Sequence, residues 1–329
     1  MSALAPTLQA FFTERLVRQR QASTHTVAAY RDTMRLLVRF AAKRRGVEPS
    51  KLDVSDLDAT VISAFLDHRE HDCHNSIRTR NARLAAIRSL FRFAALRHPE
   101  HAASIARVLA IPPKRFERRL VTYLSDSEVD ALLTAPRRST WTGRRDNALL
   151  ALAVQTGLRA SELIALRRTD IHLGVGPHLS CFGKGRKQRI TPLTAAVAAV
   201  LRSWLDEPPR HETSPVFSTR TGTPLSRDAL ERRLRTYVAI AVQTCPSLRQ
   251  KTITLHVLRH TAAMRLLHAG VDTSVIALWL GHEHVETTQV YLHADLALKE
   301  RALARTTPAH TPPGRYRPPD TLLAFLEAL

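Results

Sequence analysis

Cysteine is scarce in this 329-residue sequence, and its three copies are widely separated. Cys73, Cys181 and Cys245 form no CxxC pair, so we expect neither a disulfide framework nor a zinc ribbon. No apolar run approaches the length of a membrane span, and the N-terminus lacks the pattern of a signal peptide. These absences predict a cytoplasmic protein in a reducing compartment, with no membrane partner.

Acidic residues are also few. The chain has 29 acidic residues against 49 Lys and Arg, which gives a formal net charge of +20. An excess of this size predicts a polyanionic partner, and nucleic acid is the usual one. Arg dominates over Lys, and guanidinium groups suit bidentate phosphate contacts, so this interpretation is favoured over a protein that is merely basic.

Three common patterns of catalytic chemistry are missing: a carboxylate cluster, a Gly-rich phosphate loop and a Cys/His metal cage. His256 and His260 have the i, i+4 spacing of a zinc pair, but Val257 stands where the HExxH motif has glutamate. We therefore expect no metal and no nucleotide cofactor.

Residues 1–110 show apolar positions at helical spacing. Ser23 or Thr24 is the candidate N-cap of one helix, and Asp53 or Ser55 that of another. Four or five short helices predict a bundle whose basic side comes from an arginine-rich amphipathic segment. The main helical segments are 27–44, 57–69 and 76–97.

Residues 111–122 are predicted to be an interdomain linker. Pro112 and Pro113 stop the preceding helix, and four cations follow. An ordinary solvated loop and a segment that crosses a DNA backbone are both compatible with this pattern. The cations are Lys114, Arg115, Arg118 and Arg119.

Residues 123–300 are predicted to form a second, α-rich domain with a small antiparallel sheet. Ser125 and Glu128 have the spacing of a capping box, and Gly157 ends a buried helix. Two strands around GKGRK predict a hairpin. The expected strands are 178–182 and 188–193; the expected helices include 144–156, 160–171, 195–206, 226–242, 256–270, 273–281 and 286–303.

Residues 301–329 form a Pro-rich tail that ends in a short amphipathic segment. Asp320 can cap a helix there, with four apolar residues on one face. This helix could pack on its own domain or dock on a neighbouring subunit. The apolar residues are Leu322, Phe325, Leu326 and Leu329.

Six scattered residues would make one phosphate-transfer site if the fold brought them together. Two arginines suit the charge of a pentavalent phosphorus, a tyrosine supplies a nucleophile, and Lys and His can move protons. This set points to attack on a phosphodiester of DNA. The residues are Arg159, Lys184, His256, Arg259, His282 and Tyr291.

The segments around these residues resemble the tyrosine recombinase (phage integrase) family. TGLRASELIAL at 156–166 is similar to its first arginine box, HVLRH at 256–260 to its His-x-x-Arg box, and LGH at 280–282, nine residues before Tyr291, to its C-terminal box. GKGRKQR at 183–189 resembles the hairpin that carries the family's lysine. The match covers roughly residues 120–297, and the layout is most similar to simple two-domain integrases and Xer-type recombinases. More weakly, Ser23–Tyr30 and Thr79–Arg83 resemble its helical, SAM-like core-binding domain.

The resemblance implies a role for each residue. Arg159 and Arg259 would clamp the scissile phosphate, Tyr291 would attack it, and His256 would accept the tyrosine proton or donate to the phosphate. His282 would donate a hydrogen bond to the phosphate. Lys184 would protonate the leaving 5′ oxygen, with Lys187 as the alternative, while Glu162 would position a backbone or an arginine and His260 would be a packing residue.

The implied enzyme is a site-specific DNA recombinase that works through a 3′-phosphotyrosyl intermediate. Double-stranded DNA would be its partner, bound by a homo-tetramer on two DNA sites, alone or with a sister recombinase, and the protein would be nucleoid-associated. The alternatives are dimer resolution instead of mobile-element movement, a catalytically silent DNA-binding relative, and a type IB topoisomerase-like enzyme. The expected DNA-contacting residues are Arg80, Arg83, Arg88, Lys114, Arg115, Arg186, Lys187 and Arg189.

Overall fold

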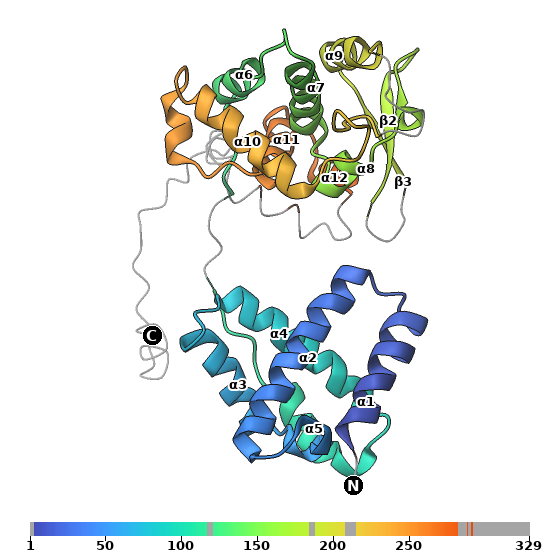
Figure 1. The fold of residues 1–329 in the computed structure, drawn as a ribbon, viewed down its shortest axis with the longest axis vertical. Helices are drawn as coiled ribbons and strands as arrows, with labels where there is room; N and C mark the ends of the chain where they lie inside the picture. Colours follow the sequence, from blue (N-terminus) through green and yellow to red (C-terminus); the bar gives the residue numbers. More distant parts are fainter. Residues whose placement is uncertain are drawn as a thin grey trace, which may run out of the picture. The chain divides into compact units, whose positions relative to one another are not determined.

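A computed structural model describes residues 3–116, 121–183, 188–207 and 215–281, together with residues 288 and 291. The chain divides into two compact units, residues 1–118 and 119–329. Both are built mainly from helices, and the second also holds a small antiparallel sheet (Figure 1). The predicted fold class is therefore confirmed.

The N-terminal unit is a helical bundle whose caps follow the sequence closely. Ser23 accepts a hydrogen bond from the backbone N–H of Thr26, as expected for an N-cap. Asp58, and neither Asp53 nor Ser55, caps the next long helix, because Asp53 caps a separate short 3₁₀ turn. The helices are α1 Leu4–Ala10, the π-helical continuation Phe11–Gln19, α2 Thr24–Arg45, α3 Ala59–His71, α4 Ile77–Ala94 and α5 Ala102–Ala110.

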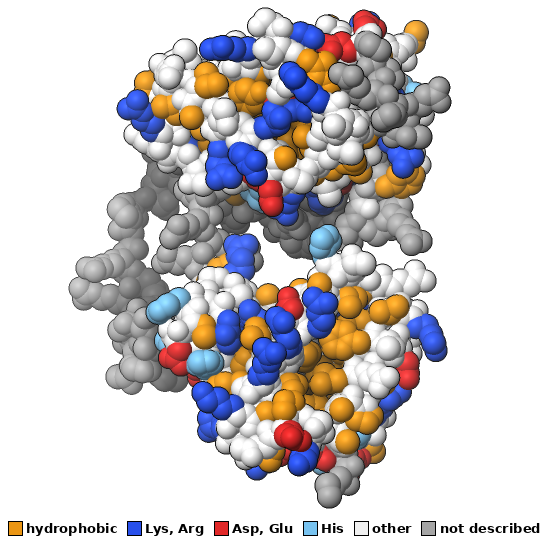
Figure 2. Space-filling model, in the orientation of Figure 1, with side chains coloured by type: hydrophobic (Ala, Val, Ile, Leu, Met, Phe, Trp, Pro, Cys, Tyr) orange, Lys and Arg blue, Asp and Glu red, His pale blue; other side chains and the backbone are white. Residues whose placement is uncertain are grey.

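The core of this unit is formed by large apolar side chains contributed by every long helix. Phe11, Leu37, Phe65 and Ile87 are completely buried in it. Apart from the buried Arg80, most charged side chains lie outside this core, and Lys and Arg predominate over acidic residues on the face shown in Figure 2. The unit can thus combine a stable apolar interior with a basic surface.

The C-terminal unit is organised around α7, Trp141–Thr156, which is buried along almost its whole length. It packs against α6, α9 and α11, while the sheet lies at one edge of the unit (Figure 1). The other elements are α6 Asp126–Thr134, α8 Ala160–Ala165, β1 Ile171–His172, β2 His178–Phe182, β3 Gln188–Pro192, α9 Ala195–Leu205, α10 Arg227–Ala241, α11 Leu255–His268 and α12 Thr273–Leu280.

The sheet has the order β1-β2-β3, with all pairs antiparallel. The hairpin formed by β2 and β3 was predicted, and its register places Cys181 opposite Arg189. The helix predicted over 160–171 is too long: α8 stops at Ala165, because Leu166 adopts extended backbone and β1 follows a 3₁₀ turn. A two-residue strand is too short to give a periodic signal in the sequence.

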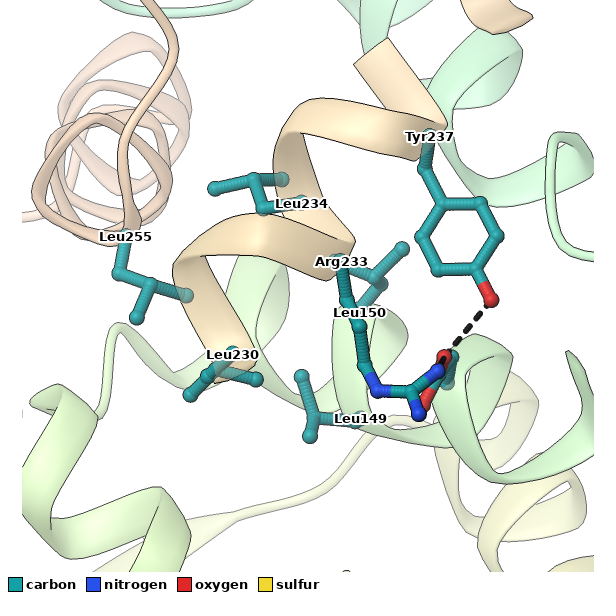
Figure 3. A pocket seen from close by; sticks show the side chains of 8 residues that line it. Leu149, Leu150, Leu230, Arg233, Leu234, Tyr237 and Leu255 are labelled. Atoms are coloured by element: carbon teal, nitrogen blue, oxygen red, sulfur yellow. Dashed lines mark hydrogen bonds and ion pairs between the residues drawn. The ribbon is translucent and has the colours of Figure 1, made fainter. Parts of the chain in front are cut away.

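A buried polar cluster holds α10 against α7. Asp146 accepts hydrogen bonds from the Tyr237 hydroxyl at 2.7 Å and from Arg233 at 2.9 Å (Figure 3). It also accepts from Arg145 at 2.7 Å. Burial and the hydrogen bond to Asp146 raise the pKa of Tyr237 above its ordinary value. Leucines, among them Leu255 at the start of α11, line the pocket beside this cluster, and we assign the cluster a structural role.

The helix predicted over 286–303 and the tail helix from Asp320 lie outside the described residues, except that residues 288 and 291 are helical. Within the described part of the chain, no helix is long and apolar enough to cross a membrane.

Candidate active site

Arg159 occupies the junction between α7 and α8. Gly157 ends α7 in the left-handed conformation, with φ of 63°, and Arg159 then stands at the N-cap of α8. Its guanidinium donates from Nη2 to the carbonyl of Gly281 at 2.9 Å and from Nη1 to Glu162 at 2.9 Å. About a third of the side chain is exposed. The turn between α7 and α8 thus leaves the Arg159 side chain partly exposed.

Arg259 lies on α11 and joins the same two segments from the other side. Its Nη1 donates to the carbonyl of Gly157 at 2.7 Å, and its Nη2 donates to that of Leu280 at 2.7 Å. The side chain is buried, and burial lowers the pKa of Arg259 to about 10, so the group stays protonated at neutral pH. An arginine has five N–H donors, so each clamped guanidinium keeps donors for an incoming anion.

Glu162 is the acidic partner of this arginine pair. It accepts from the backbone N–H of Arg159 at 2.7 Å and from both terminal nitrogens of Arg189, at 3.0 and 2.7 Å. Burial alone would raise the pKa of Glu162, but these hydrogen bonds outweigh it and lower the pKa. The expectation that Glu162 positions a backbone and an arginine agrees with these contacts.

Arg189 is turned inward in the structure, in contrast to its predicted phosphate contact. Only 9% of its side chain is exposed, because the guanidinium is paired with Glu162. The sequence could not distinguish this arginine from its neighbours in GKGRKQR, because they share one charged run. The alternation of β3 places Arg189 on the inner face next to Cys181.

Tyr291 and two histidines meet beside the arginines. Nδ1 of His260 lies 3.1 Å from the Tyr291 hydroxyl, and the His256 and His260 rings are 4.2 Å apart between centroids. His260 was predicted only to pack; its contact with the tyrosine was missed. The spacing of His256 and His260 could have revealed it, since residues four apart share a helix face.

The electrostatics of the three side chains differ. Tyr291 is 2% exposed, and burial raises the pKa of Tyr291 to about 12, although the charge of Arg259 opposes that rise. His256 reaches solvent, yet desolvation by neighbouring groups, and then the charges of Arg259 and Arg159, lower the pKa of His256. At neutral pH the tyrosine is therefore a phenol, and His256 is a neutral imidazole able to accept a proton.

Four predicted site residues fall outside the described residues, so the structure gives them no position. They are Lys184, Arg186, Lys187 and His282. Two of their described neighbours have defined positions. Gly281, which precedes His282, accepts a hydrogen bond from Arg159, and Gly183 ends the β2 side of the hairpin. Among the described residues, no group of three or more His, Cys, Asp or Glu could hold a metal ion.

The predicted DNA-contacting residues of the N-terminal unit occupy three kinds of environment. Arg80 is buried and lies 3.2 Å from Glu70, so its guanidinium is committed inside the protein. Lys114 binds the same carboxylate at 2.9 Å. Arg88 donates to the carbonyl of Ile111. Of the three, only Arg80 is buried and thereby withdrawn from phosphate, whereas Lys114 and Arg88 are partly exposed.

Arg83 and Arg115 are more accessible than Arg80, and their predicted contact with DNA stays a prediction. Arg83 is half-buried, and desolvation together with the charge of Arg69 lowers the pKa of Arg83. Arg115 is exposed, in the segment that follows α5. This segment is fixed to α4, because Asn81 exchanges two hydrogen bonds with the backbone of Lys114.

Sequence comparisons assign the chain to a family. A sequence model described as the phage integrase family matches residues 122–297, and one described as phage integrase, N-terminal SAM-like domain, matches residues 10–98. The chain belongs to the phage integrase family. It is a tyrosine-type site-specific recombinase, and the resemblance inferred from the sequence motifs is confirmed.

The relatives extend over nearly the whole chain. The y4rC protein of Sinorhizobium fredii, named as an integrase/recombinase, is 54% identical over 328 residues, which cover 100% of this chain and 99% of that protein. Tyrosine recombinase XerC of Chlamydia muridarum is 32% identical, covering 88% of this chain and 94% of its own length.

Two solved structures share the fold. The XerH site-specific recombinase bound to a palindromic difH substrate has a TM-score of 0.67 at 22% identity, covering 87% of this chain and 81% of its own. The Tn1549 transposon integrase in complex with circular intermediate DNA has a TM-score of 0.68 at 15% identity, covering 93% and 100%. At these identities the likeness concerns the fold alone.

Proposed function

We propose that Tyr291 is the nucleophile of this recombinase and that Arg159 and Arg259 bind the scissile phosphate. The tyrosine oxygen attacks phosphorus, the 5′ oxygen leaves with a proton, and a 3′-phosphotyrosyl bond forms. The 5′ hydroxyl of a partner strand then attacks that bond and releases the tyrosine. The covalent bond conserves the energy needed for rejoining.

The observation that carries this proposal is the junction of the three motif segments. Arg259 bridges the carbonyls of Gly157 and Leu280, and Arg159 reaches the carbonyl of Gly281. Residues far apart in the sequence thus hold two guanidinium groups in fixed orientation. Preorganised donors stabilise developing charge without reorganising during the reaction, which is what a pentavalent phosphorus requires.

The histidines are proposed to handle the tyrosine proton. A buried phenol with a pKa of about 12 needs an acceptor at neutral pH. His256 is our candidate, since its lowered pKa keeps it neutral. His260 holds the hydroxyl at 3.1 Å. Lys184 is proposed as the acid that protonates the leaving oxygen, and His282 as a further donor to the phosphate.

Double-stranded DNA is the proposed partner, engaged by a homo-tetramer on two sites. The titles of the XerH and Tn1549 integrase structures name DNA complexes, and the net charge of +20 supports the same partner here. We propose integration and excision of a mobile element as the biological role, because y4rC is named as an integrase/recombinase. Dimer resolution is the second candidate, supported by the likeness to XerC.

The test is covalent capture. The protein and a Tyr291→Phe variant are mixed with fragmented host DNA and denatured in SDS, and the DNA that stays attached is sequenced. We expect attachment at one repeated sequence by the native protein only, with DNA affinity unchanged in the variant. Attachment that survives in Tyr291→Phe would contradict the assignment of the nucleophile. Normal binding with no attachment by either protein would indicate a silent DNA-binding relative.

The captured sequence also separates the two biological roles. A site at the ends of a mobile element supports integration and excision, whereas a single chromosomal site or a site on a plasmid supports dimer resolution. Attachment without sequence preference would instead favour topoisomerase-like relaxation.

A further inference from the structure

Arg189 joins the hairpin to the first arginine segment. It lies on β3, and its two terminal nitrogens bind the two oxygens of Glu162 on α8, at 3.0 and 2.7 Å. The Glu162 side chain is 5% exposed and that of Arg189 9%. A bidentate, charge-assisted pair in such a dry environment has a defined geometry.

The same carboxylate also holds Arg159. Glu162 accepts from the Arg159 backbone N–H and from its Nη1. Two guanidinium groups thus share one negative charge. Arg189, with 9% of its side chain exposed, binds this carboxylate from the interior, whereas Arg159, with 33% exposed, binds it nearer the surface.

The third element at this junction is the end of α12. A Cβ atom at Gly281 would lie 2.7 Å from Nη1 of Arg189, and the carbonyl of Gly281 accepts from Arg159. Arg189 therefore packs against the residue that precedes His282. It also lies five positions after Lys184, on the strand that leaves the hairpin.

We propose that Arg189 is a positioning residue for DNA cleavage, which joins β3 to α8 and through Glu162 sets the orientation of Arg159 and the charge that Arg159 offers to the phosphate. The inference rests on the proposed phosphate-binding role of Arg159. Without Arg189, the Glu162 carboxylate is opposed by Arg159 alone and draws it inward, away from the phosphate. A buried carboxylate that loses a partner must find another or pay the cost of desolvation.

The experiment compares maximal rates of covalent complex formation on the DNA site captured by the native protein. The variants are Arg189→Met, Arg189→Lys, Glu162→Gln and the double variant Arg189→Met/Glu162→Gln. The matched control is Arg233→Met, which also removes one of two arginines from a shared buried carboxylate, Asp146, outside the candidate site.

We expect Arg189→Met to lower the maximal rate by about 10²–10³-fold, the loss typical of a misplaced donor to the transition state. The DNA concentration at half-maximal rate should change by less than about threefold, because the interaction lost with Arg159 is one made mainly to the charge that develops in the transition state. The double variant should be faster than Arg189→Met, since no unopposed carboxylate is left to draw in Arg159. The maximal rate of Arg189→Lys should lie between those of Arg189→Met and the native protein, because lysine restores the positive charge but not the two parallel donors of the guanidinium.

Other results would overturn the inference. If Arg189 contacts phosphate, Arg189→Met would raise the half-maximal DNA concentration and leave the maximal rate intact. If it only stabilises the fold, the rate would fall with the folded fraction measured by circular dichroism, as in Arg233→Met, and the double variant would give no rescue. If the native protein itself forms no Tyr291-dependent complex, the proposed function fails, and this result is distinct from an active protein indifferent to Arg189.

Discussion

At the scale of single residues, the environment of the candidate site shifts the pKa values of Tyr291 and His256 in opposite directions. Burial raises the pKa of Tyr291 to about 12, while desolvation and two arginines lower that of His256 below its ordinary value of about 6.5. At neutral pH one group therefore holds its proton and the other can accept it. Groups whose pKa values are pushed apart in this way are candidates for acid–base roles, which agrees with the role proposed for His256.

This arrangement predicts the pH dependence of cleavage. Because the pKa of His256 lies below about 6.5, the rate of covalent complex formation should stay level from about pH 8 down to about pH 6.5 and fall only at lower pH, as the imidazole becomes protonated. His256→Gln should lose this acidic limb and be slower by about 10²–10⁴-fold. The measurement is single-turnover cleavage on the captured site from about pH 8 to well below pH 6.5, so that the acidic limb is covered.

The comparison variant is His260→Gln. If His260 only holds the tyrosine hydroxyl, this variant should keep the acidic limb and lose less than about tenfold, the value of one hydrogen bond. Disappearance of the limb in His260→Gln, with the limb retained in His256→Gln, would make His260 the proton acceptor.

At the scale of elements, the close approach of α7, α11 and α12 depends on Gly157. Its φ of 63° favours glycine, and a Cβ atom there would lie 2.6 Å from Cδ2 of Leu280 and 3.1 Å from Cβ of Ala262. The carbonyl of Gly157 is also an acceptor of Arg259. A side chain at this position should therefore disturb both packing and the arginine clamp.

We expect Gly157→Ala to lower the free energy of unfolding by about 1–3 kcal/mol and to slow cleavage as well, as strain and crowding add. Gly176→Ala is the control, because Gly176 has φ of 68° and nothing within 4 Å of the added Cβ, so it carries the backbone strain alone. Urea unfolding of both variants gives the comparison. Equal losses would show that the contacts with Leu280 and Ala262 can relax.

Most elements could be predicted from the sequence because their signals are local. The capping box of Ser125, the glycine after α7 and the hairpin around GKGRK each depend on a few adjacent residues. The end of α8 at Ala165 and the inward direction of Arg189 depend on tertiary contacts instead. The sequence motifs indicated the identity of Arg159 and Arg259, but not that both donate to backbone carbonyls at the end of α12.

At the scale of the whole molecule, the positive charge is unevenly available. Arg80 and Lys114 form ion pairs with Glu70, whereas Arg115 is exposed. The net charge of +20 therefore does not tell which cations can meet phosphate. Binding to DNA depends on the exposed subset, and each phosphate neutralised releases counterions and steepens the dependence on salt.

Exposed and buried arginines should therefore contribute differently to the salt dependence of DNA binding. If 6–10 phosphates are contacted, DNA affinity should fall by about 10³–10⁵-fold between 50 and 200 mM salt. Arg115→Ala should reduce the slope of log affinity against log salt by about one, because it removes one exposed cation. Arg80→Met should leave the slope unchanged and instead destabilise the N-terminal unit, because Glu70 loses one of its partners. Fluorescence anisotropy over a salt series, with all proteins in the Tyr291→Phe background to prevent cleavage, measures both slopes. A flat salt response of the parent would contradict phosphate-based binding, and a reduced slope in Arg80→Met would show that this buried arginine is released to the DNA on binding.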